Sequence, residues 1–106
     1  MSTKTLLVAV ACLWAGHTVA QGGATIAPHQ LPPPLQALYA KERPDLGRYG
    51  HCAAAFDSRT DGMKMALSCA IYVRLSAQGE RLAVSLCGER AKLLKVKAPC
   101  LLIVED

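Results

Sequence analysis

The longest alternation of apolar and polar positions runs from Met63 to Leu75. Its odd positions are apolar or carry a thiol, whereas its even positions are lysine, alanine, serine, alanine, tyrosine and arginine. Successive side chains of a β-strand point to opposite faces, so the pattern predicts a strand with one row on a core and a mixed row facing water or a partner. A helix explains the stretch less well, because Met65, Val73 and Leu75 then leave the apolar stripe.

A second alternating run covers residues 81–87. A two-residue turn at Gln78-Gly79 would place its leucines and valine opposite the apolar row of the first run, which predicts a β-hairpin. Cys87 then falls on the opposite face, and a bulge at Gly88 could restore its parity. Residues 89–94 fit either a helical turn or a continuing strand.

Three shorter segments complete the pattern. Residues 35–43 are good helix formers ended by Pro44, which predicts a two-turn helix. Residues 52–56 read as a strand that enters a polar hairpin loop at 57–62, with two registers open, only one of which sets Cys52 opposite Cys69. The continuous apolar run 100–104 predicts a strand buried on both faces near the middle of the sheet.

These segments predict a mostly β domain with one short N-terminal helix, built as a small antiparallel meander or sandwich-like sheet and stapled by disulfides. The alternative is a small disulfide-linked helical domain. In that alternative, the leucines of 82–93 share one helical face.

The first twenty residues have the build of a secretory signal peptide. Lys4 precedes an apolar core at 6–15, and the small residues before Gln21 predict cleavage after Ala20. Cys12 raises the alternative of lipidation, although the residues before it are a poor match to a lipoprotein signal. Residues 21–34 are rich in Gly, Ala and Pro and predict a flexible leader, so that 35–106 form a single small disulfide-stabilised domain. The expected location is periplasmic or secreted.

Four cysteines remain after the predicted cleavage: Cys52, Cys69, Cys87 and Cys100. An even number in a short exported chain predicts two disulfides, which a domain of this size needs because its core alone is marginal. Three pairings are open. We favour Cys69 with Cys87 and Cys52 with Cys100.

Charge sets limits on partners. Residues 21–106 carry 11 Lys and Arg against 8 Asp and Glu, a net charge of +3. This balance suits an acidic protein or an anionic envelope surface but lacks the dense basic stripe of a nucleic-acid binder. We therefore expect a protein partner, with acidic character, peripheral contact with the envelope as an option, and no nucleic acid.

No catalytic or metal motif stands out. Asp57, Asp61 and Gly62 match three positions of a calcium loop, but Arg59 and Ser68 occupy two others where oxygen ligands are required. His51 beside Cys52 is a poor nucleophile pair, because neighbouring strand residues point to opposite faces. We expect no cofactor, no metal and no enzymatic activity.

The candidate contact residues are polar and basic. On the assumption of strands, Tyr72 and Arg74 lie on the non-core face of the central strand, and a basic series lies near the C-terminus: Arg90, Lys92, Lys95 and Lys97. The sequence thus predicts an exported binding protein of the inhibitor, immunity or accessory type. A structural or assembly component of the cell envelope is the alternative, and a small hydrolase ranks third.

Overall fold

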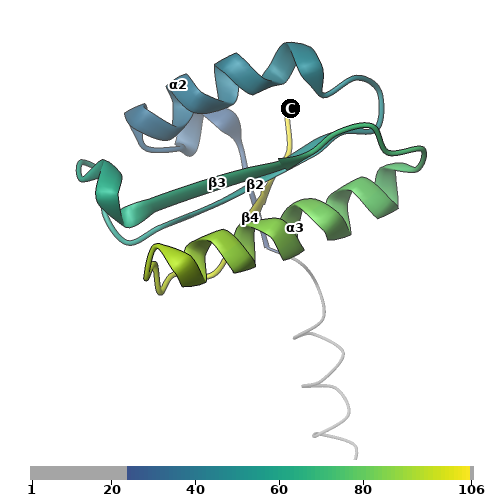
Figure 1. Ribbon diagram of the computed structural model, residues 1–106. Helices are drawn as coiled ribbons and strands as arrows, with labels where there is room; N and C mark the ends of the chain where they lie inside the picture. Colours follow the sequence, from purple (N-terminus) through teal and green to yellow (C-terminus); the bar gives the residue numbers. More distant parts are fainter. Residues whose placement is uncertain (1–23, 106) are drawn as a thin grey trace, which may run out of the picture.

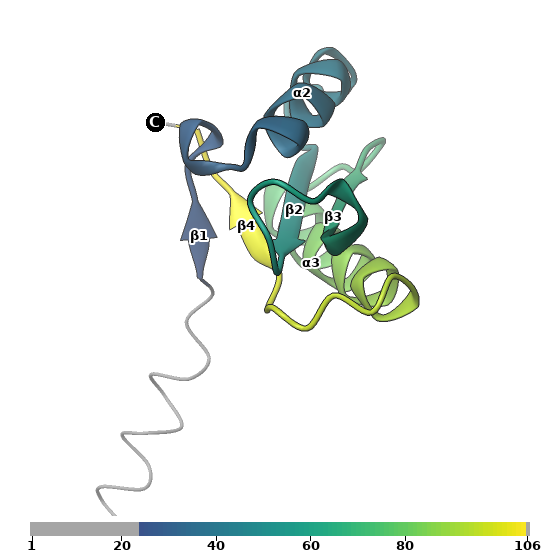
Figure 2. The same cartoon turned by 90° about the vertical axis from the view of Figure 1, so that its left-hand side faces the viewer.

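A four-stranded mixed sheet with one helix on each face forms the described part of the protein, residues 24–105 of a computed structural model (Figure 1). The strands are β1 (Thr25–Ile26), β2 (His51–Phe56), β3 (Met65–Ala70) and β4 (Leu101–Ile103), in the spatial order β1-β4-β2-β3. The helices are α2 (Pro33–Glu42) and α3 (Ser76–Leu93), and short 3₁₀ turns lie at Pro28–Gln30, Arg43–Asp45 and Gly62–Lys64. Figure 2 shows α2 and α3 on opposite sides of the sheet.

The predicted sheet and the two disulfides are confirmed, but the chain is not mostly β. Helix α3 is eighteen residues long and occupies the segment where the second alternating run predicted a strand. Its buried positions are Gly79, Ala83, Cys87 and Ala91, spaced four residues apart. That stripe is helical in period but made of small residues, whereas Leu82 and Val84 remain about 40% exposed. The hairpin across Gln78-Gly79 is therefore wrong, and Gly88 is an exposed helix residue rather than a bulge.

The first alternating run is a strand only in its middle. Residues 65–70 form β3, while 62–64 form a 3₁₀ turn and 71–75 form a loop. The ladder stops because His51, the partner of Ala70, is the first residue of β2. Two residues later Tyr72 adopts a φ of 59°, which no strand can accommodate.

The hairpin register places Cys52 opposite Cys69, and these two cysteines form one disulfide. The second disulfide joins Cys87 of α3 to Cys100, next to β4. The favoured pairing was therefore wrong. It assumed that Cys87 belonged to a strand beside β3, whereas Cys87 lies on the buried face of a helix that packs on the sheet.

The supposed flexible leader is also wrong for its described part, residues 24–34. Strand β1 pairs in parallel with β4, and Leu31 and Pro32 are buried. The prolines do not block the helix, because α2 begins at Pro33 and its first turn lacks amide partners in any case. The predicted helix at 35–43 is confirmed as α2, which packs Leu35 and Tyr39 on the sheet.

Strand β4 is confirmed as an inner strand, paired with β1 on one side and β2 on the other. The two faces of β4 contribute side chains to two different cores. Leu102 packs with the alanines of the sheet and α3, whereas Ile103 packs with Leu35, Tyr39 and Met65 on the α2 side.

Lys95 and Lys97 lie after α3 and not on a strand edge. The amides of Lys95 and Val96 donate to the carbonyls of Lys92 and Ala91, which forms a Schellman cap with Lys95 at a φ of 61°. Asp57 then accepts the amides of Lys97 and Ala98 at 2.7 and 2.8 Å. This acidic side chain thus holds the chain that leads into β4.

Two disulfides indicate an oxidising, extracellular-type environment. The predicted signal peptide, Cys12 and the cleavage site after Ala20 lie outside the described residues. Within residues 24–105, no helix is both long and apolar enough to cross a membrane.

Candidate functional site: a groove along an open strand edge

Among residues 24–105, strand β3 lies at the edge of the sheet and pairs only with β2. Its hydrogen-bonding direction follows from the ladder. The amide of Asp57 donates to the carbonyl of Lys64 at 2.9 Å, so even-numbered residues of this strand bond to β2. The N–H and C=O groups of Met65, Leu67 and Cys69 consequently point away from the sheet, toward the open edge.

Cavities line this edge from end to end. A cavity of about 310 Å³ lies at the Met63 end, and one of about 490 Å³ lies at the Cys69 end. Leu67 and Arg90 line both, which makes them one continuous groove between α2 and α3. We call it the β3 groove.

The walls of the β3 groove are apolar at the Met63 end, whereas Glu42, Ser68 and Glu89 make them more polar at the Cys69 end. Several of the apolar side chains are well exposed. Helix α2 contributes Leu38, which is 47% exposed, and the turn before β3 contributes Met63, which is 83% exposed. The end of α3 contributes Leu93 and Leu94, at 83% and 44%. Apolar side chains gathered along an unpaired strand edge are typical of a surface that binds another chain.

The charges of the groove are unevenly placed. Arg90 lies at its middle, and Glu42 and Glu89 lie at the Cys69 end. The one ion pair found among residues 24–105 joins Arg43 to Glu105, so none of these three side chains has an ionic partner there.

The predicted contact residues do not form one surface. Only Arg90 lines the β3 groove. Tyr72 and Arg74 lie in the exposed loop between β3 and α3, not on a strand face, and Tyr72 is 93% exposed. Lys92 is exposed on α3 outside the groove, and Lys95 and Lys97 belong to the segment after the helix.

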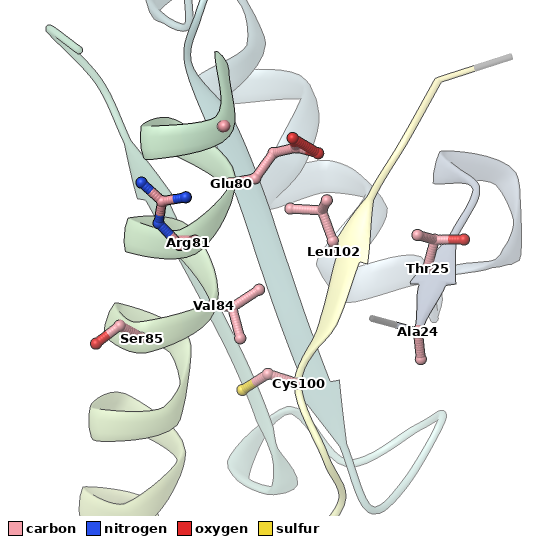
Figure 3. A pocket seen from close by; sticks show the side chains of 9 residues that line it. Ala24, Thr25, Glu80, Arg81, Val84, Ser85, Cys100 and Leu102 are labelled. Carbon is pink, nitrogen blue, oxygen red and sulfur yellow. The ribbon is translucent and has the colours of Figure 1, made fainter. Parts of the chain in front are cut away.

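A second groove opens on the other side of α3, where the helix leaves β4 and β1 uncovered. Its volume is about 640 Å³. Figure 3 shows Glu80 and Val84 directed from α3 toward Leu102 of β4, with Arg81 and Ser85 on the side of the helix turned away. The floor is apolar, and the polar side chains at its rim do not converge on one point.

The side chain of His51 meets a serine hydroxyl rather than a thiol nucleophile. Its Nε2 lies 2.8 Å from the Oγ of Ser76, the first residue of α3. Neither residue lines the grooves described above, and Cys52 is oxidised. Among residues 24–105, no cluster of histidine, cysteine and carboxylate side chains is suited to a metal ion. Asp61 instead accepts the amide of Met63 in the turn that leads into β3.

Among residues 24–105, the pKa that departs most clearly from its usual value belongs to Tyr39, on the buried face of α2. The Tyr39 hydroxyl donates to Glu105 Oε2 at 3.0 Å, and Arg43 holds both oxygens of that carboxylate, at 3.1 and 2.9 Å. Burial, assisted by the bond to Glu105, raises the pKa of Tyr39 to about 12. This cluster anchors the end of the chain to α2, so its role is structural.

The β3 groove could not be found from the periodicity of the sequence. Its walls come from α2, the turn before β3 and the end of α3, elements that lie far apart in the chain. The available signal was the set of leucines in residues 82–94. None of them belongs to the buried stripe of α3, so they remain to line a surface. No protein-family model matches the chain, and searches of curated proteins and solved structures found no significant match.

Proposed function

We propose that this protein is an exported binding module that takes up an extended segment of a partner protein along β3. The observation that carries the proposal is the row of outward-facing backbone groups at Met65, Leu67 and Cys69, which lies in the β3 groove with exposed apolar side chains at its Met63 end. An added strand would satisfy those groups and cover the exposed leucines at the same time. The protein thereby acts by contact rather than by catalysis, in an inhibitory, immunity or accessory role.

A proline placed in the edge tests the proposal. Leu67→Pro removes an amide that faces the open edge, so the ladder with β2 keeps all its hydrogen bonds. Leu67→Ala is the matched control, since it removes the same side chain and keeps the amide. Both variants should keep the far-UV circular dichroism spectrum and both disulfides.

Binding is measured with the oxidised mature protein as bait in an extract of the native envelope. A single stoichiometric soluble partner is expected. Its retention should fall at least tenfold with Leu67→Pro and less with Leu67→Ala. Addition of that partner should slow hydrogen exchange at the amides of Met65, Leu67 and Cys69. Equal retention by both variants, or unchanged exchange at the three amides, would rule out strand addition. Co-fractionation with membrane or wall that is insensitive to Leu67→Pro would favour the structural alternative.

A further inference from the structure

Two kinds of occupant would fit the β3 groove: a second copy of this chain or a segment of a different protein. In a symmetric dimer, two β3 strands would pair edge to edge in antiparallel orientation. The register that uses all of their outward-facing N–H and C=O groups sets the two Leu67 residues opposite each other, and Met65 of each strand opposite Cys69 of the other. Arg90 lies beside Leu67 in the groove, so each Arg90 would then approach its copy near the two-fold axis. Two unpaired like charges at the centre of the contact disfavour the symmetric dimer.

The face of each position in an added strand follows from the two cores. Odd-numbered residues of β3 belong to the core under α2, and even-numbered residues belong to the core under α3. Directly opposite residues in a ladder share a face. Partner side chains opposite Met65 and Leu67 would therefore point toward Leu38 and Met63, while the side chain between them would point toward α3 and Arg90.

We infer that the partner segment has an acidic residue between two apolar residues, with its carboxylate paired to Arg90. This inference rests on the proposed strand addition and specifies its partner. The apolar residues fit the wall formed by Leu38 and Met63, and the acid supplies the counter-charge that Arg90 lacks within residues 24–105. Glu42 and Glu89 restrict the acid to the middle, because a carboxylate at the Cys69 end would meet like charge.

Two blocked peptides test the charge preference. One has the core Thr-Val-Asp-Val-Thr and the other has lysine in place of the aspartate; both carry a terminal fluorophore for anisotropy measurements on the oxidised mature protein. We expect the Asp peptide to bind about three- to tenfold more tightly than the Lys peptide. The aspartate forms a solvent-accessible ion pair with Arg90, whereas the lysine is repelled by it. Arg90→Glu should invert the preference. Lys92→Glu, on the same helix outside the groove, should leave it intact.

Each outcome decides the inference. Equal binding of the two peptides, or a preference unchanged by Arg90→Glu, overturns the acidic partner. So does a failure of the Asp peptide at millimolar concentration to slow hydrogen exchange at Met65, Leu67 and Cys69. With any of these three outcomes, strand addition itself is judged separately, by the effect of Leu67→Pro on the partner captured from the envelope. A concentration-dependent dimer in sedimentation that Leu67→Pro abolishes would instead identify a second copy as the occupant.

Discussion

Tyr39 shows how one buried side chain joins α2 to the C-terminal end of the described residues. It lies on α2, is 6% exposed and donates its hydroxyl hydrogen to Glu105, just beyond β4. Arg43, one turn further along, pairs with the same carboxylate. The phenol must keep its proton to serve as donor, because a phenolate beside Glu105 would be both desolvated and repelled.

We expect this contact to make the protein lose stability in mild alkali. The pKa of Tyr39 is about 12 in the folded protein and near 10 in the unfolded chain, so the unfolded state gives up its proton first. The stabilisation is complete below pH 10 and is lost as the pH rises toward 12. It should amount to about 1 kcal/mol of unfolding free energy between pH 8.5 and 11.

Urea unfolding at these two pH values, compared with Tyr39→Phe, measures the effect. The variant starts less stable, since it lacks a hydrogen bond to a charged group, but its loss between the two pH values should be smaller by that amount. Identical losses in both proteins would mean that the phenol ionises freely in the folded state.

At the scale of elements, the fit of α3 against the sheet depends on small residues. Ala83 and Ala91 pack in one cluster with Ala53, Ala55 and Ala66 of the sheet, and Cys87 is bonded to Cys100. A helix with so little side-chain volume on its buried face can approach a sheet closely. Gly79 lies against the turn that leads into β2, where a Cβ would clash with the carbonyl oxygen of Tyr49.

Two glycines of α3 should therefore respond in opposite ways to alanine. Alanine is favoured over glycine within a helix by about 1 kcal/mol. At Gly88 a Cβ meets nothing within 4 Å, so Gly88→Ala should raise the unfolding free energy by about 0.5 to 1 kcal/mol. At Gly79 the clash with a backbone oxygen outweighs that gain, and Gly79→Ala should destabilise by about 1 to 3 kcal/mol. Thermal unfolding of both variants measures this, and stabilisation by Gly79→Ala would contradict the close packing of α3.

The same stripe explains which elements could be predicted from the sequence. Residues 35–43 and 100–104 follow their pattern because large apolar side chains such as Leu35 and Ile103 face a core, whereas the alanine-rich strand at 52–56 was delimited by the polar loop that follows it. Helix α3 does not follow its pattern, because its buried stripe is glycine, alanine and cysteine, whereas its leucines face solvent or a groove. The alternation of Leu82, Val84 and Leu86 therefore reports surface positions and imitates a strand.

The structure of residues 24–34 and the β3 groove could not be predicted from the sequence, for different physical reasons. The prolines of residues 21–34 contributed to the prediction of a flexible leader, but prolines at the start of α2 only remove amides that a helix leaves unpaired anyway. The β3 groove depends on tertiary placement. Arg90 was among the predicted contact residues and lines the groove, while Leu38, Met63 and Leu93 line it only because α2 and α3 flank the edge of β3.

For the molecule as a whole, stability rests on a thin core held by two disulfides. The described domain of residues 24–105 buries many alanines, and a domain of this length is expected to have a total stability of about 4 to 12 kcal/mol. The two bridges close short loops, with sequence separations of 17 for Cys52–Cys69 and 13 for Cys87–Cys100. Chain entropy assigns each of them about 3 kcal/mol, with little difference between the two.

Removal of the bridges should consequently be graded. Replacement of either cysteine pair by alanine should leave a folded protein at 25 °C with about 3 kcal/mol less unfolding free energy, and replacement of both pairs should leave it largely unfolded. Urea titration followed by circular dichroism at 222 nm distinguishes the four proteins, because α2 and α3 melt with the domain. The pair Cys87–Cys100 has a second role, since it joins α3 to the inner strand β4, so its loss should also speed hydrogen exchange at Leu102 and Ile103. A variant without either bridge that kept the native spectrum and a cooperative urea transition would show that the alanine core is sufficient by itself, and would remove the reason to place folding in an oxidising compartment.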